Sequence, residues 1–189
     1  MGVTSTSMLP SRPTLRRFTR PEYDRLVALG FFRQERIELL HGTIVRMSPI
    51  GPPHRDVVDR LNELLLPRLI GRARVSIQQP FAAWDDSEPE PDVSVIPLGD
   101  YSVDHPQRAH LIIEVADSSL EEDRELKARL YAASGVPEYW IVNLVQHVVE
   151  IHTEPMKGAY GRVRRAKASE TIAPGAFPDV PINVADLLP

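Results

Sequence analysis

The chain has 189 residues, of which 42% are hydrophobic and none is cysteine. This length suits one domain with a full core and is short for two, and the lack of cysteine excludes disulfides and thiolate metal sites. No stretch approaches the roughly 18 apolar residues of a membrane span, and residues 1–13 lack the apolar segment of a signal peptide. We therefore expect a cytoplasmic protein with an N-terminal arm over residues 1–17 and a single domain over residues 18–189.

The formal net charge of −4 is unevenly distributed along the chain. Residues 85–125 contain 13 acidic residues and two arginines, whereas residues 1–36 contain seven arginines and three acidic residues. Residues 155–170 add five basic residues against one glutamate. The net charge argues against indiscriminate nucleic-acid binding, but an acidic centre between basic ends fits a metal-dependent enzyme that acts on a polyanion. Solvated loops would explain the basic ends equally well.

The first half of the chain predicts a helix, a hairpin and a second helix. Thr19 is a typical N-cap for a helix that runs to residue 30, with a proline in its first turn. Apolar residues on both sides of a His-Gly pair predict a β-hairpin over residues 36–47. After two prolines, residues 57–69 carry apolar side chains at helical spacing, so we expect a second helix that packs on a sheet.

Short apolar runs predict the strands of that sheet. They cover residues 75–83, 93–97, 111–116, 139–144 and 147–153, and one or two edge strands and a short segment at 184–188 follow.

A third helix is predicted over residues 120–134. Ser118 and Ser119 each precede a glutamate by three residues, which is the spacing of a capping box, and a glycine at 135 ends the helix. The spacing predicts two adjacent faces. The core face carries Leu126, Leu130 and Ala133, and the other carries Asp123, Lys127 and Tyr131.

Two acidic residues occur in apolar strands. Glu114 lies inside one apolar run, and Asp92 stands at the entrance of another. An ionised carboxylate in a buried strand costs several kcal/mol unless it is compensated. A divalent cation shared by both acids would compensate them most completely. The alternative is structural, with Glu114 paired to Arg108 or Arg124 and Asp92 at the end of a loop.

Four further residues are candidates either for the site or for a structural role. Glu38 lies among apolar residues of the hairpin and is either a third acid of the site or an outward strand residue. His54 shares the inward face of its helix and is either a catalytic or ligand-orienting residue or a satisfied core histidine. Tyr131 and Trp140 are typical of packing, and Tyr131 is the better placed of the two to reach the site.

Several ordered motifs link these residues. They are ELLHG at 38–42, MSP at 47–49, His54, EPDVSV at 90–95, IEVADSSL at 113–120, Asp123-Arg124, Lys127, Tyr131 and GVPEYWIV at 135–142. This series, from about residue 18 to residue 155, resembles the Uma-type restriction endonuclease family of the PD-(D/E)xK nuclease superfamily. The resemblance implies a restriction-endonuclease-like α/β (α+β) core, in which a mixed central sheet is flanked by helices and the active site lies where the central strands diverge.

The resemblance also implies site roles. Asp92 and Glu114 match the two acids that bind Mg²⁺ or Mn²⁺ in that superfamily, where a lysine orients the attacking water. The position of this lysine, two residues after Glu114, holds Ala116. Because the role depends on where the ammonium lies and not on which segment supplies it, Lys127 is our candidate. The alternative for Lys127 is an exposed ion pair with Asp123.

We therefore predict a Mg²⁺-dependent endonuclease that hydrolyses phosphodiester bonds in DNA, with Asp92, Glu114 and Lys127 as catalytic residues. Two active sites are needed to cut both strands in one encounter, so we expect a homodimer. The alternative is a non-catalytic nucleic-acid-binding or assembly module that retains the nuclease fold. The missing lysine and the acidic net charge favour that alternative, whereas the presence of both acids favours the enzyme. A third possibility is a metal-dependent hydrolase of a smaller phosphorylated substrate.

Overall fold

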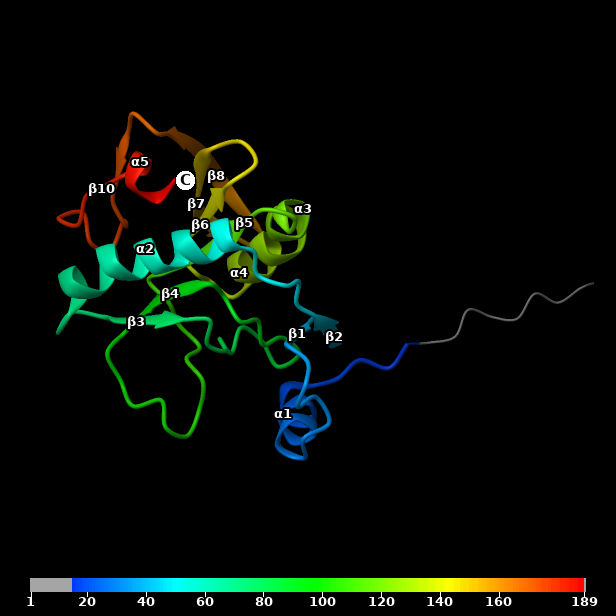
Figure 1. Ribbon diagram of the computed structural model, residues 1–189. Coiled ribbons are helices and arrows are strands. Elements are labelled where there is room, and N and C mark those ends of the chain that lie inside the picture. The colour runs from blue at the N-terminus through cyan, green and yellow to red at the C-terminus, as the bar shows by residue number, and fades with distance from the viewer. Residues whose placement is uncertain (1–14, 189) are drawn as a thin grey trace, which may run out of the picture.

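The computed structural model describes residues 15–188, so most of the predicted N-terminal arm lies outside the described residues. A six-stranded mixed sheet lies between helices on its two faces (Figure 1). Its order is β3-β4-β5-β6-β7-β8, and the neighbours β5 and β6 are parallel while every other pair is antiparallel. The predicted fold class is confirmed.

The sheet strands are β3 (Arg74–Ile77), β4 (Val93–Ile96), β5 (Leu111–Ala116), β6 (Glu138–Asn143), β7 (Val148–Met156) and β8 (Ala159–Lys167). The helices are α1 (Arg20–Ala28), α2 (Pro52–Leu69), α3 (Leu120–Glu122), η1 (Asp123–Lys127), α4 (Ala128–Ala133) and α5 (Val184–Leu187). Two small two-stranded sheets pair β1 (Ile37–Leu40) with β2 (Thr43–Arg46), and β9 (Thr171–Ile172) with β10 (Ile182–Asn183).

The helix α2 covers one face of the sheet (Figure 1). Its apolar residues repeat at helical spacing and are buried against every second residue of β4 and β5, as strand alternation requires. The buried set includes Val57, Leu61, Leu65, Leu69, Val93, Val95, Leu111, Ile113 and Val115. This packing confirms the predicted second helix and its contact with the sheet.

The opposite face is covered by the segment from α3 to α4. The alternate residues of β5 and β6 point there and form a second buried cluster with Ala128 and Tyr131 of that segment. Glu114 follows the same alternation, so its side chain points toward η1 and α4 and away from α2. The sequence pattern of β5 therefore decides which helices Glu114 can meet.

The hairpin β1–β2 has the predicted turn. His41 and Gly42 both have positive φ values, of 47° and 73°, as a tight two-residue hairpin turn requires. One side of the hairpin packs with Tyr23 of α1 in a small apolar cluster. The predicted cap of α1 is also present, because the Thr19 N–H donates to the Glu22 carboxylate at 3.0 Å.

The predicted strand over residues 75–83 is wrong beyond Ile77. Gln78 has a φ of 49°, which is left-handed and takes the chain out of the strand conformation, and the proline at 80 lacks a ladder donor. The early end of the strand has a consequence for the site, because the Gln78 amide then donates to Asp92 at 3.2 Å.

The third helix contains a π-helical turn that the sequence did not predict. The turn is η1, between the α-helical pieces α3 and α4. The predicted capping boxes are wrong, because Ser119 has helical backbone angles and its hydroxyl donates to the Asp123 carboxylate at 2.7 Å. Within residues 15–188, no helix has both the length and the apolar character needed to cross a membrane.

The predicted core face of the third helix is only partly correct. Leu130 is fully buried, but Leu126 is half-buried and Ala133 is exposed. The face with Asp123, Lys127 and Tyr131 is buried instead. Lys127 is 6% exposed, so the alternative of an exposed ion pair with Asp123 is wrong.

Candidate functional site

A cavity of about 100 Å³ lies between the β1–β2 hairpin, the start of α2, the β4–β5 region and the segment around η1. Its lining is rich in acids. The acidic members are Glu38, Glu90, Asp92, Glu114, Asp117, Glu122 and Asp123, and the lysine and arginines are Lys127, Arg36 and Arg46. Such an excess of carboxylates in one partly enclosed space favours a bound cation.

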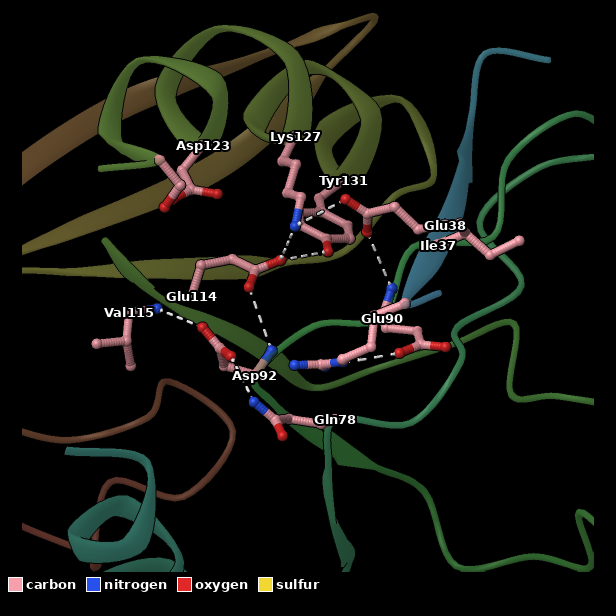
Figure 2. Close-up of polar contacts among 12 residues, drawn as sticks. Ile37, Glu38, Gln78, Glu90, Asp92, Glu114, Val115, Asp123, Lys127 and Tyr131 are labelled. Atoms are coloured by element: carbon pink, nitrogen blue, oxygen red, sulfur yellow. Dashed lines mark hydrogen bonds and ion pairs between the residues drawn. The ribbon is translucent and has the colours of Figure 1, made fainter. Parts of the chain in front are cut away.

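Glu114 is the most constrained acid of this cavity (Figure 2). Its carboxylate accepts hydrogen bonds from the Tyr131 hydroxyl at 2.8 Å, the Lys127 ammonium at 3.2 Å and the Asp92 N–H at 3.2 Å. Its side chain is buried in strand β5. Burial raises the pKa of Glu114 well above its usual value, and the nearby Lys127 only partly offsets this effect.

Asp92 stands beside Glu114, just before strand β4. Its carboxylate accepts the Val115 N–H at 2.9 Å and the Gln78 amide at 3.2 Å, and it lies 2.9 Å from the His54 Nε2. Burial raises the pKa of Asp92, but the hydrogen bonds and charge of these partners outweigh burial and hold it below its usual value.

The two acids are joined through the backbone. Asp92 gives its N–H to the Glu114 carboxylate, and the residue after Glu114 gives its N–H to the Asp92 carboxylate. This reciprocal pattern fixes both carboxylates at the edge of the same cavity. The neighbouring strands of the sheet therefore bring together two acids that are 22 positions apart.

Lys127 reaches this pair from the π-turn (Figure 2). Its Nζ lies 3.2 Å from Glu114 Oε1 and 3.4 Å from Glu38 Oε1. Burial lowers the pKa of Lys127, but the carboxylates of Glu114, Glu38 and Asp123 outweigh burial and raise it above its usual value. The ammonium therefore stays charged inside the cavity.

Two further predicted candidates contact the same group of residues. Glu38 is 2% exposed and accepts the Glu90 N–H at 3.2 Å besides its ion pair with Lys127, so it is not an outward strand residue. His54 lines the cavity through its contact with Asp92, and its Nδ1 is buried without a hydrogen-bond partner among the described residues.

Glu114 pairs with neither of the two arginines that the structural alternative proposed for it. Arg124 donates to Glu150 of β7, with its Nε 3.0 Å from Glu150 Oε2, and Arg108 makes no ion pair among residues 15–188. Trp140 is buried in the core and donates to Glu138. It therefore packs, as expected.

Sequence reasoning did not single out Asp123 and Gln78 as site residues. Asp123 lines the cavity one turn before Lys127, and burial raises its pKa to about 6. The position of Asp123 four residues before Lys127 places both on one helical face, so the sequence could have identified Asp123 as a site residue. Gln78 gave none, because its contact with Asp92 depends on the left-handed backbone at that position.

The donor set of the cavity fits a hard divalent cation. Asp92 and Glu114 offer carboxylate oxygens, which Mg²⁺ and Mn²⁺ prefer over nitrogen or sulfur. Within residues 15–188, no three acidic or histidine side chains converge in metal-ligating geometry. Two carboxylates with water molecules is a usual way of binding Mg²⁺, which keeps several of its waters.

Comparison with known proteins gives the chain a family. No curated protein matches it. A solved structure described as a putative nuclease belonging to DUF820 from Anabaena variabilis is 15% identical and superposes with a TM-score of 0.68, covering 90% of this chain and 97% of that one. At this identity the likeness establishes the fold. The profile of the Uma2 family, described as "Putative restriction endonuclease", matches residues 20–185. The family description supports a nuclease, and the chain belongs to the Uma2 family.

Proposed function

We propose that this protein is a Mg²⁺-dependent endonuclease that hydrolyses phosphodiester bonds in DNA. The observation that carries the proposal is the position of Lys127. The motif position two residues after Glu114 holds Ala116, yet the Lys127 ammonium lies 3.2 Å from the Glu114 carboxylate. An ammonium beside the acid pair is what the chemistry requires, whichever segment supplies it.

Asp92 and Glu114 would hold the cation, Mg²⁺ or Mn²⁺. When bound, the ion would neutralise charge on the phosphate and lower the pKa of a bound water. The fixed hydrogen bonds of both carboxylates support this role, because a ligand that is already oriented loses less entropy on binding.

The other residues have roles that follow from their contacts. Lys127 would donate a hydrogen bond to the attacking water or to a phosphate oxygen, and it is charged before the substrate arrives. Tyr131 and Glu38 position Glu114 and Lys127, since each bonds one of them directly. His54 orients Asp92 through the contact at 2.9 Å.

Plasmid nicking tests the proposal. Purified protein with Mg²⁺ is expected to nick supercoiled DNA, and Asp92→Asn, Glu114→Gln and Lys127→Met are each expected to lower the rate at least about 100-fold. Lys127→Met should still bind Mn²⁺ in calorimetry, because it removes no ligand. Arg129→Met is the matched control, since Arg129 is an exposed helical cation paired with Glu125.

Two results would contradict the proposal. Undiminished nicking by Lys127→Met would exclude the proposed catalytic role of this lysine. Nicking that neither acid variant affects would show that the activity does not depend on Asp92 and Glu114. A single-stranded RNA of matched length, tested in parallel, decides between DNA and RNA as the substrate.

The second candidate function is a non-catalytic module that binds nucleic acid or assembles with partners. The alanine at position 116 favours this second function, because the motif lysine is absent from its usual place. This candidate predicts Mg²⁺-independent binding and no nicking by the wild type.

We also propose that the enzyme acts as a homodimer, because cutting both strands in one encounter needs two sites. Analytical ultracentrifugation with and without a DNA duplex tests this. A protein that linearises plasmid in one step while remaining a monomer would contradict it.

A further inference from the structure

Two arginines line the mouth of the acidic cavity within residues 15–188. Arg36 precedes strand β1 and Arg46 ends strand β2, so both stand at the open end of the hairpin. The Arg36 carbonyl accepts the Met47 N–H at 2.9 Å, which holds this end of the hairpin together. Arg36 and Glu38 are two positions apart on one extended segment, so their side chains leave the same face, toward the cavity.

Arg46 already forms an ion pair with Glu35, which is not one of the two site acids Asp92 and Glu114. Its guanidinium donates to Glu35, with Nε 3.0 Å from Glu35 Oε2, and its side chain is 74% exposed. An exposed pair of this kind contributes little to stability. Nothing in its geometry directs Arg46 to the interior of the cavity.

Arg36 is held much more loosely. Its Nη2 lies 3.8 Å from Glu90 Oε2, which is beyond hydrogen-bonding distance, and the guanidinium makes no hydrogen bond to any described residue. A guanidinium carries five N–H donors in a planar fork that matches carboxylate and phosphate oxygens. The Arg36 side chain is 42% exposed and no described residue uses these donors, so the guanidinium can turn to a ligand at the mouth of the cavity.

The charge of the cavity creates a need for such a group. The lining has seven acidic residues, and the buried Lys127 is already paired with Glu114 and Glu38. Asp117 and Glu122 of this lining are exposed while Lys127 is buried, so an approaching phosphodiester meets carboxylates before it meets the ammonium. A cation at the mouth lowers that electrostatic barrier and fixes the direction of approach.

We propose that Arg36 is a phosphate-binding residue that holds a backbone phosphate of the nucleic acid next to the scissile one. Its guanidinium leaves Glu90 and binds the phosphate through paired N–H donors. This inference rests on the proposed function, because it assumes a polyanionic substrate at the cavity. Arg36 acts on binding and alignment, so its loss is expected to raise KM more than it lowers kcat.

Binding of a fluorescent DNA duplex tests this role. Anisotropy is measured with Ca²⁺ in place of Mg²⁺, over a series of KCl concentrations, for wild type and Arg36→Gln. We expect Arg36→Gln to weaken binding about tenfold, as for one charge-assisted hydrogen-bonded contact. The slope of log Kd against log[KCl] should fall by about 0.9, the value for one phosphate contact. The control Arg129→Gln should change neither quantity.

A double variant distinguishes phosphate binding by Arg36 from a merely structural role as the counter-ion of Glu90. If Arg36 serves only to neutralise Glu90, Glu90→Gln/Arg36→Gln restores wild-type binding. If Arg36 binds phosphate, the double variant stays as weak as Arg36→Gln, and Glu90→Gln alone binds as well as or better than wild type.

The two proposals can fail separately. Wild-type protein that binds the duplex with the expected Arg36 dependence but does not nick DNA overturns the proposed function and leaves this inference standing. Protein that nicks DNA while Arg36→Gln keeps wild-type affinity and salt slope overturns this inference alone. No salt-dependent binding by wild type overturns both.

Discussion

Replacing Lys127 by methionine removes the ammonium that contacts both Glu114 and Glu38, at 3.2 and 3.4 Å. At 3.2 Å and an effective dielectric constant of about 20, one such pair is worth about 5 kcal/mol. Because breaking a buried ion pair leaves an uncompensated charge, the expected loss of stability is about 3–5 kcal/mol. For a chain of this size, the Tm should fall by roughly 6–20 °C.

This loss should depend on pH in a definite direction. Burial raises the pKa of Glu114 even with Lys127 present, and removal of the ammonium raises it further. The folded protein then binds more protons than the unfolded chain, whose glutamates titrate near about 4.3. Stability therefore falls as pH rises from that value toward the folded-state pKa. The deficit of Lys127→Met should be small at about pH 4 and largest at about pH 8.

Thermal unfolding in EDTA, followed by circular dichroism at both pH values, measures this deficit. Arg129→Met is the control, because Arg129 and Glu125 form an exposed helical pair, and it should change the Tm little at either pH. The double variant Lys127→Met/Glu114→Gln should recover part of the loss, since a neutral amide needs no counter-charge. Equal deficits at low and high pH, or a double variant less stable than Lys127→Met, would refute the reasoning.

Three further outcomes are expected in metal-free protein. Burial raises the pKa of Asp123 to about 6, so Asp123→Asn should match wild type at about pH 4 and exceed its stability by up to about 3 kcal/mol at pH 8, measured by urea unfolding. Tyr131→Phe removes the hydroxyl that donates to Glu114 at 2.8 Å and should cost about 1.5–3 kcal/mol in the same assay. Burial lowers the pKa of His152, whose Nε2 has no hydrogen-bond partner among the described residues. The contribution of His152 to stability should therefore decrease as pH drops below about 6.5, so the Tm of His152→Phe relative to wild type should rise over that range.

Local patterns were sufficient to predict most elements of the fold. The hairpin β1–β2 was evident because a His-Gly pair supplies the two positive φ values that its turn requires. Strand β5 was evident from an unbroken apolar run, and its period of two also decides that Glu114 faces the helical segment with Lys127. In both places the short-range preference and the final packing agree.

The sequence was a poor guide where tertiary contacts determine the backbone. The π-turn η1 has an ordinary helical composition, and partners outside the helix hold it. The Tyr139 hydroxyl donates to the Asp123 carbonyl at 3.2 Å, and Arg124 is bound by Glu150 of β7. The helical pattern of the sequence cannot reveal these contacts, because both partners lie outside the helix. The prediction of a regular helix with a capping box therefore failed at the turn that contributes Asp123 and Lys127 to the site.

Packing links the absence of a lysine at position 116 to the position of Lys127. Ala116 is completely buried in the cluster that contains Ala128, the residue directly after Lys127. A lysine at 116 would need the space into which this helical segment packs, since interiors are filled close to crystal density. The small side chain lets the helix approach strand β5 closely enough for Lys127 to reach Glu114. The absence of a lysine at 116 is therefore part of the arrangement that supplies the ammonium from the helix.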